Sequence, residues 1–480
     1  MRRILYLVIM LSAVGLLSFG QFNIAHNASN TPGVRSSYTQ VAFGPDGILH
    51  IVWDEDRGAT GSDVMYATWD GTTLSTPVIV SDSGEESCYF PHIAVNNRGM
   101  IAVIWVQKKT NHVALYDPDT KEWEAPFEIA GPTYGGGFDI RSKVALDNED
   151  NVYAFFFSSY SFSTYARCRI DGVWEDIVQL SSPGRPAKEG AICAAPDGWA
   201  WVVYHIKEDD GDYKPAYRKR TKDTSWTTEK LLGGVGSQGK GYINVGLDSV
   251  PYVSVQALAG HEGVNDIQVI KVDEDTNPRE VVNEESGAFH YPRVAIDNEG
   301  YLWVASQFGQ GDMGLGIRYF DNTTGEWVDH GYLPKSSGWP KLPGISADAY
   351  GNVAMSFESI TDGYGEAYFC TRYPVEPKHF FPPINAKATV SVTGLMSQSP
   401  EIVFNLSWDK NPENNDTYLQ GYKIFKKQGN GEWEVLAEVA KDELSYDVTF
   451  TEAMTQKVQF AVAAVSVAGF EGDKKVFGAQ

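Results

Sequence analysis

The sequence predicts an all-β protein, a seven-bladed β-propeller followed by a smaller β-sandwich domain. The first observation is a repeat of an apolar strand, an acidic turn and a second strand, clearest in Tyr291–Ser306 (YPRVAIDNEGYLWVAS). The second is the period, because the turns of seven copies lie 52, 51, 48, 52, 50 and 51 residues apart, at Gly47, Gly99, Asp150, Gly198, Val250, Gly300 and Gly351. The third is a change of pattern after Tyr373. A period near fifty built from strands is typical of a propeller.

Each repeat continues beyond its second strand, so the unit holds four strands. A third strand candidate follows, such as Val64–Trp69 or Gly316–Phe320, and a polar turn then leads to an aromatic residue. Trp123, Trp174 and Trp327 mark the start of a fourth strand in three repeats. Four strands per unit make one propeller blade, and their alternating pattern suits sheets that pack face to face.

The last repeat has three strand candidates and then runs into a proline-rich segment. No fourth strand follows there, but the N-terminal segment Gln21–His26 resembles the missing one. We therefore expect the ring to close with strands from both ends of the propeller sequence in one blade. Closure of that kind removes exposed sheet edges.

The N-terminus is predicted to be a secretory signal peptide. Arg2 and Arg3 form the charged start, Ile4–Leu17 is the apolar run, and Ser18 and Gly20 supply small residues at a cleavage site. A membrane anchor is the alternative, but the run is shorter than the ~20 residues that span a bilayer. We expect a secreted, periplasmic or cell-surface protein with no membrane span after cleavage.

The predicted domain boundaries follow from these patterns. The parts are residues 1–20 (signal peptide), 21–373 (propeller), 374–383 (linker) and 384–480 (sandwich domain). The linker is assigned from its prolines, and such segments separate parts of a chain that fold independently.

Charge and cysteine content exclude some functions. The formal net charge of −23 argues against nucleic acid as a partner, because phosphate binding relies on a basic surface. Cys88, Cys168, Cys193 and Cys370 include no CxxC pair, so a zinc knuckle is unsupported. In an exported protein they either form disulfides or are small buried residues, and the spacing does not decide between these.

The C-terminal part resembles a fibronectin type III domain over about a hundred residues. The matching features are Trp408 at the end of the second strand, the third strand Gly421–Phe425 (GYKIF), and the strand Phe460–Ala464 (FAVAA) that leads to Ala468-Gly469. Phe460 stands where that family usually has Tyr. The resemblance implies a spacer or binding module rather than a catalyst.

The preceding part, from Gln21 to about Arg372, resembles the sialidase-like (BNR-type) propellers of secreted bacterial proteins. The residues that carry the resemblance are His50–Gly71 (HIVWDEDRGATGSDVMYATWDG) and the repeated apolar-Asp-x-x-Gly turn. The Ser-x-Asp-x-Gly-x-x-Trp boxes and the early Arg-Ile-Pro of true sialidases are absent. The resemblance therefore implies the fold and leaves the activity open.

Candidate ligand-binding residues concentrate at one mouth of the predicted central channel, on the loops that enter each innermost strand. Their Arg, His, Tyr and Trp side chains suit an acidic sugar, since aromatic rings stack on sugars and Arg pairs with carboxylates. Arg35, Arg141 and Arg293 are predicted at equivalent positions in three blades. The full set is Arg35, Tyr89, His92, Arg141, Tyr242, Arg293 and Trp339.

Three functions remain open for this mouth. The leading hypothesis is passive recognition of carbohydrate or another cell-surface ligand. The second is an enzyme on acidic polysaccharide. A sialidase-like glycosidase would use Asp54 or Asp56 as the acid, Tyr291 or Tyr242 as the nucleophile and Glu262 as the base, with a clamp of Arg35, Arg141 and Arg293. A polysaccharide lyase would move a proton with Tyr89 and His92 or with His290 and Tyr291. The third is a structural or protein-interaction module without catalysis.

We expect no cofactor, with structural calcium as an open alternative. The repeated turn aspartates are predicted to be structural, because Asp bonds nearby backbone in tight turns. The segments Asp54–Asp56 and Asp209–Asp212 offer calcium-type oxygen ligands, but neither matches the twelve-residue calcium loop. Solvated loops are the favoured interpretation of both.

Overall fold

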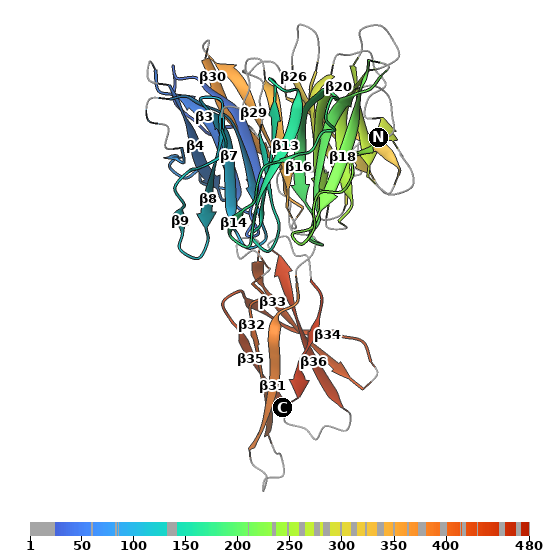
Figure 1. Cartoon of the computed structure of the whole chain (residues 1–480). Helices are drawn as coiled ribbons and strands as arrows, with labels where there is room; N and C mark the ends of the chain where they lie inside the picture. Colours follow the sequence, from blue (N-terminus) through green and yellow to red (C-terminus); the bar gives the residue numbers. More distant parts are fainter. Residues whose placement is uncertain are drawn as a thin grey trace, which may run out of the picture. The chain divides into compact units, whose positions relative to one another are not determined.

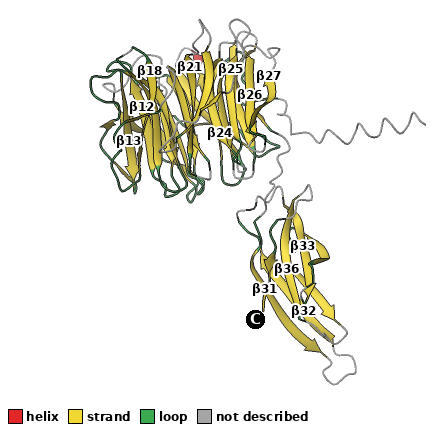
Figure 2. Cartoon of the chain, turned by 90° about the vertical axis from the view of Figure 1, so that its right-hand side faces the viewer, coloured by secondary structure: helices red, strands yellow, loops and turns green. Residues whose placement is uncertain are grey.

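The computed structural model describes residues 25–58, 61–81, 84, 86–131, 142–209, 211–232, 237–246, 249–258, 265–272, 279–281, 289–297, 300–308, 314–321, 324–333, 340–348, 351–361, 364–372, 381–393, 401–412, 414, 419–429, 431–450, 457–466 and 472–479. The chain forms two compact units: the first has Met1–Gly44, Leu49–Ala347 and Val353–Pro374, and the second has Val375–Gln480 with the short stretches Pro45–Ile48 and Asp348–Asn352. The protein is all-β, with no α-helix among the residues just given, and strands make up most of both units (Figures 1 and 2).

The first unit repeats an antiparallel order of strands along the chain. The first strands are β2 (Ser36–Phe43), β6 (Cys88–Val95), β11 (Lys143–Leu146), β16 (Ala187–Ala194), β20 (Ser237–Val245), β24 (Phe289–Ile296) and β28 (Lys341–Ala347). The second strands are β3 (Leu49–Asp56), β7 (Ile101–Gln107), β12 (Val152–Ser158), β17 (Ala200–Lys207), β21 (Pro251–Leu258), β25 (Leu302–Phe308) and β29 (Val353–Thr361). The third strands are β4 (Ser62–Trp69), β8 (Thr110–Asp117), β13 (Ser163–Ile170), β18 (Tyr213–Arg220), β22 (Asn265–Lys271), β26 (Gly314–Asp321) and β30 (Tyr364–Thr371).

The outermost strands are shorter and less regular. They are β5 (Val78–Ile79), β9 (Glu122–Trp123), β10 (Phe127–Ala130), β14 (Val173–Trp174), β15 (Val178–Gln179), β19 (Lys230–Leu231), β23 (Arg279–Val281) and β27 (Glu326–Leu333). Trp327 lies in a full fourth strand, as predicted. Trp123 and Trp174 instead lie in two-residue strands, and a second short strand follows each of them, so the outer strand is interrupted there.

Each repeat makes its own sheet, apart from one join. The groups β16–β19 and β20–β23 share an eight-stranded sheet through the single pair Tyr213 and Ser237. The outer position of the last sheet is taken by β1 (His26–Asn27), which pairs with β30 in the order β1-β30-β29-β28. The expected pairing of an N-terminal strand with the last repeat is thus confirmed at His26, whereas 21–24 lie outside the described residues.

The core lies between successive sheets. The second strands are buried on both faces, as β7 shows along its whole length, which explains their nearly continuous apolar sequence. One buried cluster joins Val52 of β3 to Val103 of β7. Another joins Val41 and Ile51 to Phe369 of β30, so the last sheet packs against the first.

The turn aspartates Asp147, Asp297 and Asp348 are structural, as predicted, whereas Asp248 lies outside the described residues. Asp297 Oδ1 accepts a hydrogen bond from the Tyr301 amide at 2.9 Å, and its Oδ2 accepts one from Trp303 Nε1 at 2.9 Å. Asp147 holds the Asn151 amide in the same way. The Asp carboxylate therefore joins the turn to the buried strand that follows it.

The second unit contains two antiparallel-rich sheets. One has the order β35-β32-β31-β38 and the other β34-β33-β36-β37. Its core includes Trp408, Tyr422 and Phe460, with the Phe460 ring 5.1 Å from that of Phe404. The strands are β31 (Ile384–Thr393), β32 (Glu401–Asp409), β33 (Leu419–Gln428), β34 (Glu434–Ala440), β35 (Ser445–Phe450), β36 (Val458–Ser466), β37 (Lys475–Val476) and β38 (Gly478–Ala479).

The four cysteines bear on the question of disulfide bonds, and the secondary structure bears on that of a membrane-spanning helix. Cys88, Cys168, Cys193 and Cys370 are all buried and free, so they are packing residues rather than disulfide partners. Burial raises the pKa of the Cys168 thiol to about 12, which keeps it protonated. Within the described residues, no helix has the length and apolar character needed to cross a membrane.

Candidate functional site

A β-bulge recurs in six of the seven first strands described in the first unit, shortly before a common position in the strand. In β6 the register shifts between Tyr89 and His92, and in β24 between His290 and Arg293. β2, β16, β20 and β28 have a shift at the corresponding place. Bulges of this kind re-aim side chains and are frequent beside active sites.

Four bulges hold a large residue in the left-handed backbone region. We call Tyr38 (φ 53°), Phe90 (φ 57°), Tyr291 (φ 55°) and Leu342 (φ 56°) the bulge residues. The left-handed region costs a residue with a Cβ about 1–2 kcal/mol, and such strain is found mainly at functional positions. Among the described residues, the same strained conformation therefore recurs at this end in four of the seven first strands.

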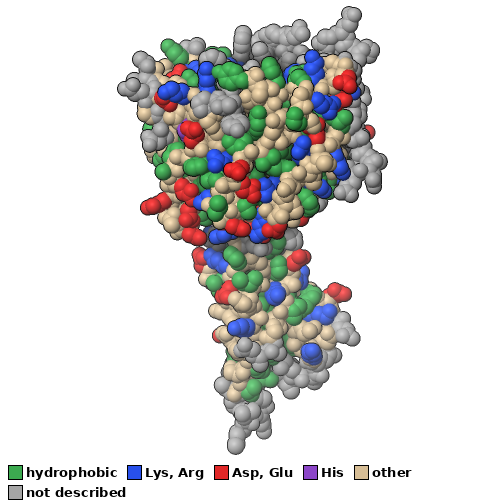
Figure 3. Space-filling view, viewed as in Figure 1, with side chains coloured by type: hydrophobic (Ala, Val, Ile, Leu, Met, Phe, Trp, Pro, Cys, Tyr) green, Lys and Arg blue, Asp and Glu red, His purple; other side chains and the backbone are tan. Residues whose placement is uncertain are grey.

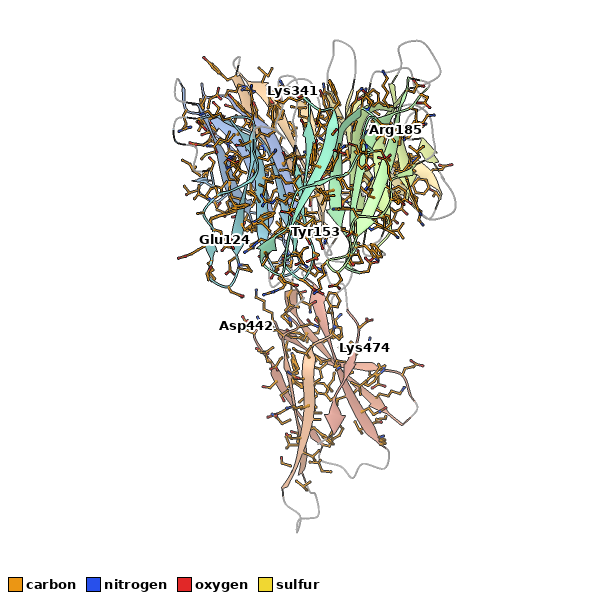
Figure 4. The ribbon with its side chains drawn as sticks, viewed as in Figure 1. Glu124, Tyr153, Arg185, Lys341, Asp442 and Lys474 are labelled. Carbon is orange, nitrogen blue, oxygen red and sulfur yellow. The ribbon has the colours of Figure 1, made fainter. Side chains whose placement is uncertain are left out.

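The bulges lie toward one end of the sheets. Lys341 and Arg185, which lie at or just before the start of β28 and β16, are at one end of the first unit, and Tyr153 and Glu124 are at the other (Figure 4). The first strands therefore begin at the Lys341 end. The predicted entry loops belong to this end.

One position of the first strand can be compared in all seven repeats, namely the residue that pairs with the fourth residue of the second strand. His92 lies opposite Ile104, Tyr242 opposite Ser254 and Arg293 opposite Ala305. We call these the ring residues, one from each repeat: Gln40, His92, Lys143, Ala191, Tyr242, Arg293 and Gly344.

Three ring residues contact one another across the first unit. His92 Nε2 lies 3.3 Å from Tyr242 Oη, although 150 residues separate them. The Arg293 guanidinium carbon lies 4.9 Å from the centre of the Tyr242 ring, a cation–π distance. His92 and Arg293 are only 5% and 7% exposed. The first strands of three separate repeats therefore converge on one buried polar cluster.

The electrostatics of this cluster set its protonation state. Burial lowers the pKa of His92 well below its usual value, and the charges of Lys143 and Arg293 lower it further. Burial raises the pKa of Tyr242, while the Arg293 charge opposes that rise. At neutral pH the cluster therefore holds a neutral imidazole, a protonated phenol and two cations.

Aromatic side chains lie next to the bulges. The Tyr38 ring meets the Phe90 ring edge-on at 4.4 Å, and Tyr89 lies 6.1 Å from Phe90. Tyr38 and Tyr89 are partly exposed. Phe90 also packs with Val106 in a small apolar cluster. This end thus offers aromatic surface close to the buried cations, a combination that suits an acidic sugar.

Asp54 lies beneath this end and is fully buried in β3. Its Oδ2 accepts a hydrogen bond from the Phe90 amide at 3.3 Å. Burial raises its pKa well above the usual value, opposed by the Arg35 charge and supported by Glu358. Glu358 pairs with Lys341 at 3.1 Å. The placement favours Asp54 as a support for the Phe90 bulge rather than as an acid that reaches a sugar.

The structure brings together some of the predicted residues and separates others. His92, Tyr242 and Arg293 meet, but the lyase pair Tyr89 and His92 does not, because Tyr89 packs against Phe90. Tyr291 is a partly buried bulge residue.

The remaining predicted residues have other placements. Of His290 only the backbone is described, opposite Gln307. Glu262, Arg141 and Trp339 lie outside the described residues.

The predicted equivalence of Arg35 and Arg293 is wrong. Arg35 is exposed and precedes β2, whereas Arg293 lies inside β24 after the bulge. The ring position of the first repeat is Gln40. Counted back from the turn, the ring position lies seven residues before Gly47 and before Gly300 alike. Arg35 lies twelve residues before Gly47, so that count already separates it from Arg293.

Sequence reasoning missed Lys143 and the bulges themselves. A signal was present: Phe90-Pro91, Tyr291-Pro292 and Leu342-Pro343 each end one residue before a ring position. Proline supplies no amide hydrogen to a strand ladder and is common at bulges. A large residue followed by proline at a fixed place in the repeat therefore marks the bulge.

The described residues give little support for a bound metal ion. They include no group of three or more His, Cys, Asp and Glu side chains arranged to hold one. Glu55 Oε2, in a segment considered for calcium, accepts hydrogen bonds from Trp53 Nε1 at 3.0 Å and from the Ser36 and Thr31 hydroxyls at 3.1 Å each. Those donors occupy the oxygen that a cation needs.

Acidic and basic side chains are interspersed over the face shown in Figure 3.

No protein-family model and no curated protein matches the chain. Similar solved structures include a fungal alcohol oxidase of the AA5 family in complex with copper, with TM-score 0.50 and 10% identity over 96% of this chain and 100% of that chain. An ulvan lyase of polysaccharide lyase family PL25 has TM-score 0.46 and 10% identity over 71% and 97%. A Trypanosoma rangeli sialidase has TM-score 0.40 and 10% identity over 90% and 83%. At such identities the likeness concerns the fold alone.

Proposed function

We propose that the protein is an exported seven-bladed β-propeller that binds an acidic carbohydrate at its channel mouth, with a fibronectin type III domain as spacer. The observation that carries the proposal is the contact of Arg293 with Tyr242, which in turn lies 3.3 Å from His92. Residues so far apart in the chain meet when equivalent positions of a ring of sheets converge on one axis. The seven ring residues, one per repeat, support that architecture.

The cluster selects the charge of the ligand. Lys143 and Arg293 both lie near enough to His92 to lower its pKa, and two cations held close together repel each other. A carboxylate or sulfate group at the mouth offsets that repulsion. His92 adds no third charge, because its imidazole stays neutral.

The partly exposed aromatic rings select the body of the ligand. Tyr38, Tyr89 and Tyr291 supply flat surface on which a sugar ring stacks, and two of them contact Phe90. Packing against Phe90 restrains the Tyr38 and Tyr89 rings before a ligand arrives, which lowers the entropy lost on binding. An acidic polysaccharide has both the negative charge and the sugar rings that these residues suit.

A second candidate function is β-elimination on a uronate, favoured by the protonation states of the His92 and Tyr242 pair. Arg293 and Lys143 neutralise the carboxylate, which acidifies the hydrogen on the adjacent carbon. Neutral His92 accepts that proton, the C–H electron pair forms a C=C bond, and the C–O bond to the leaving sugar breaks. Tyr242 donates its proton to the leaving oxygen.

One set of incubations tests both functions. The full chain is mixed with an acidic polysaccharide, the same polymer with its carboxylates reduced, and a neutral polymer. Retention of the acidic polymer alone supports recognition, and an ultraviolet-absorbing unsaturated end shows elimination. New reducing ends without unsaturation would mean hydrolysis instead. If none of the polymers is retained or cut, the cluster is purely structural and the proposal fails.

A further inference from the structure

One strand of the second unit leaves half of its edge uncovered. β31 pairs with β32 along its length, but on its other side β38 pairs only with Lys387 and Ala388. Among the described residues, no strand pairs with that side from Thr389 to Thr393. This segment, which we call the open edge, is the C-terminal half of β31 (Figure 2).

The open edge is exposed on both faces. Val390 and Val392 point to one face and are 54% and 41% exposed. Thr389 and Ser391, which alternate with them on the other face, are exposed as well. The end of β31 is therefore poorly covered, whereas Phe404, opposite Val390 on β32, packs against the core.

The open edge also lacks the protection that natural edges carry. Charged side chains and prolines normally keep an edge strand from pairing with another chain. β34 and β35, the edges of the two sheets, include Glu434, Glu438 and Asp447. In contrast, no charged residue occurs from Ala388 to Pro400, although 21% of the chain is charged.

The sequence of the open edge is a palindrome, Thr389-Val390-Ser391-Val392-Thr393. Two copies paired antiparallel about a two-fold axis at Ser391 place Val390 opposite Val392 and Thr389 opposite Thr393. Pairs of β-branched residues and Thr–Thr pairs are favourable across strands. A two-fold interface requires this kind of self-complementary surface.

The charge of the chain does not oppose such pairing at this place. Residues 375–480 contain ten Lys, no Arg and fourteen Asp or Glu, a formal charge of −4. Most of the −23 therefore belongs to the first unit. Repulsion between two copies is weakest where the C-terminal units approach each other.

We propose that the open edge binds the open edge of a second copy of this chain, which joins the two β35-β32-β31 sheets into one continuous sheet. The inference is independent of the carbohydrate proposal. A five-residue pairing buries less than the ~1,200 Å² of stable interfaces. The association is therefore weak and rises with protein concentration.

The oligomeric state of the full chain tests the proposal. Sedimentation or light scattering over a wide concentration range should show a species of twice the mass of one chain. The double variant Val390→Lys/Val392→Lys places like charges opposite each other and should stay monomeric. Val435→Lys is the matched control, because Val435 is also 54% exposed but lies on β34, and it should dimerise as the native chain does.

Two further variants test the register. Val390→Glu/Val392→Glu should also be monomeric alone but form a mixed dimer with the double Lys variant. Ser391→Cys should cross-link two copies on mild oxidation, since the four native cysteines are buried, whereas Val435→Cys should not.

Two outcomes would overturn the proposal. One is a native chain that stays monomeric at every concentration. The other is a dimer that both double variants retain, which would place the contact elsewhere.

Discussion

The His92 imidazole and the Tyr242 hydroxyl lie 3.3 Å apart, and they come from first strands that are three repeats apart in the chain. No contact within one sheet or between neighbouring sheets explains such a pair. It arises because the bulges turn equivalent positions of several sheets toward a common centre. The candidate site therefore depends on first strands from three different repeats.

The hydroxyl of Tyr242 is expected to matter more for chemistry than for binding. Tyr242→Phe keeps the ring under Arg293 and removes only the oxygen. Binding of an acidic polysaccharide should change little, whereas any elimination should be abolished, because the proton donor is gone. The ultraviolet absorbance of the product measures elimination, and retention on immobilised polymer measures binding. Equal loss of both would show that the hydroxyl binds the ligand rather than moving a proton.

Removal of the Arg293 charge is expected to weaken binding of acidic ligands. Arg293→Ala should lower affinity at least tenfold, and added salt should weaken the native protein in the same direction, because the attraction is partly screened. Arg293→Lys keeps the charge and should recover part of the affinity. The melting temperature of each variant serves as the folding control. An Ala variant that binds normally while folded would remove Arg293 from the site.

Acid should destabilise the first unit through His92. Its pKa in the folded state is lowered, so the unfolded chain takes up a proton near pH 6.5 that the folded chain refuses. The stability this provides is present above that pH and is lost as the pH falls toward the folded value, at up to about 1.4 kcal/mol per pH unit. His92→Gln should flatten the decline in melting temperature between pH 7 and pH 5. An unchanged slope would contradict the pKa shift.

The contribution of Asp54 to stability should change with pH in the direction opposite to that of His92. Its folded pKa is raised, so its contribution is fully present below the unfolded value near 3.8 and is lost as the pH rises through the folded value. Asp54→Asn keeps a neutral group of similar size in place. At pH 7 the variant should therefore melt at the native temperature or above it. A large fall would show that the carboxylate form is needed there.

Glycine should be better tolerated than alanine at a bulge. Leu342 has φ 56°, and a residue with a Cβ pays about 1–2 kcal/mol for that conformation. Leu342→Gly should thus be more stable than Leu342→Ala, the reverse of the usual order in strands. Ile345, a buried strand residue nearby in β28, is the matched site at which alanine should be the more stable. The same order at both sites would contradict the strained bulge.

Much of the fold followed from local pattern. Period, turn residues and alternation predicted an all-β chain with repeated strands, because each turn such as Asp297–Gly300 has a local hydrogen-bonding cause. The N-terminal pairing was also foreseen, from the missing strand of the last repeat. Local pattern failed for the outer strands, since Trp123 and Trp174 lie in two-residue pieces.

The sequence by itself determined the strand repeats, the structural turns and a set of Arg, His and Tyr near one end of the sheets. Only the tertiary structure decided which of them meet: His92 with Tyr242 and Arg293, but not with Tyr89. The position of these residues is visible in the sequence, since Gln40 and Arg293 both lie seven residues before the turn glycine of their repeat. Which of their side chains touch is not visible, because residues far apart in the chain meet only when several sheets pack together.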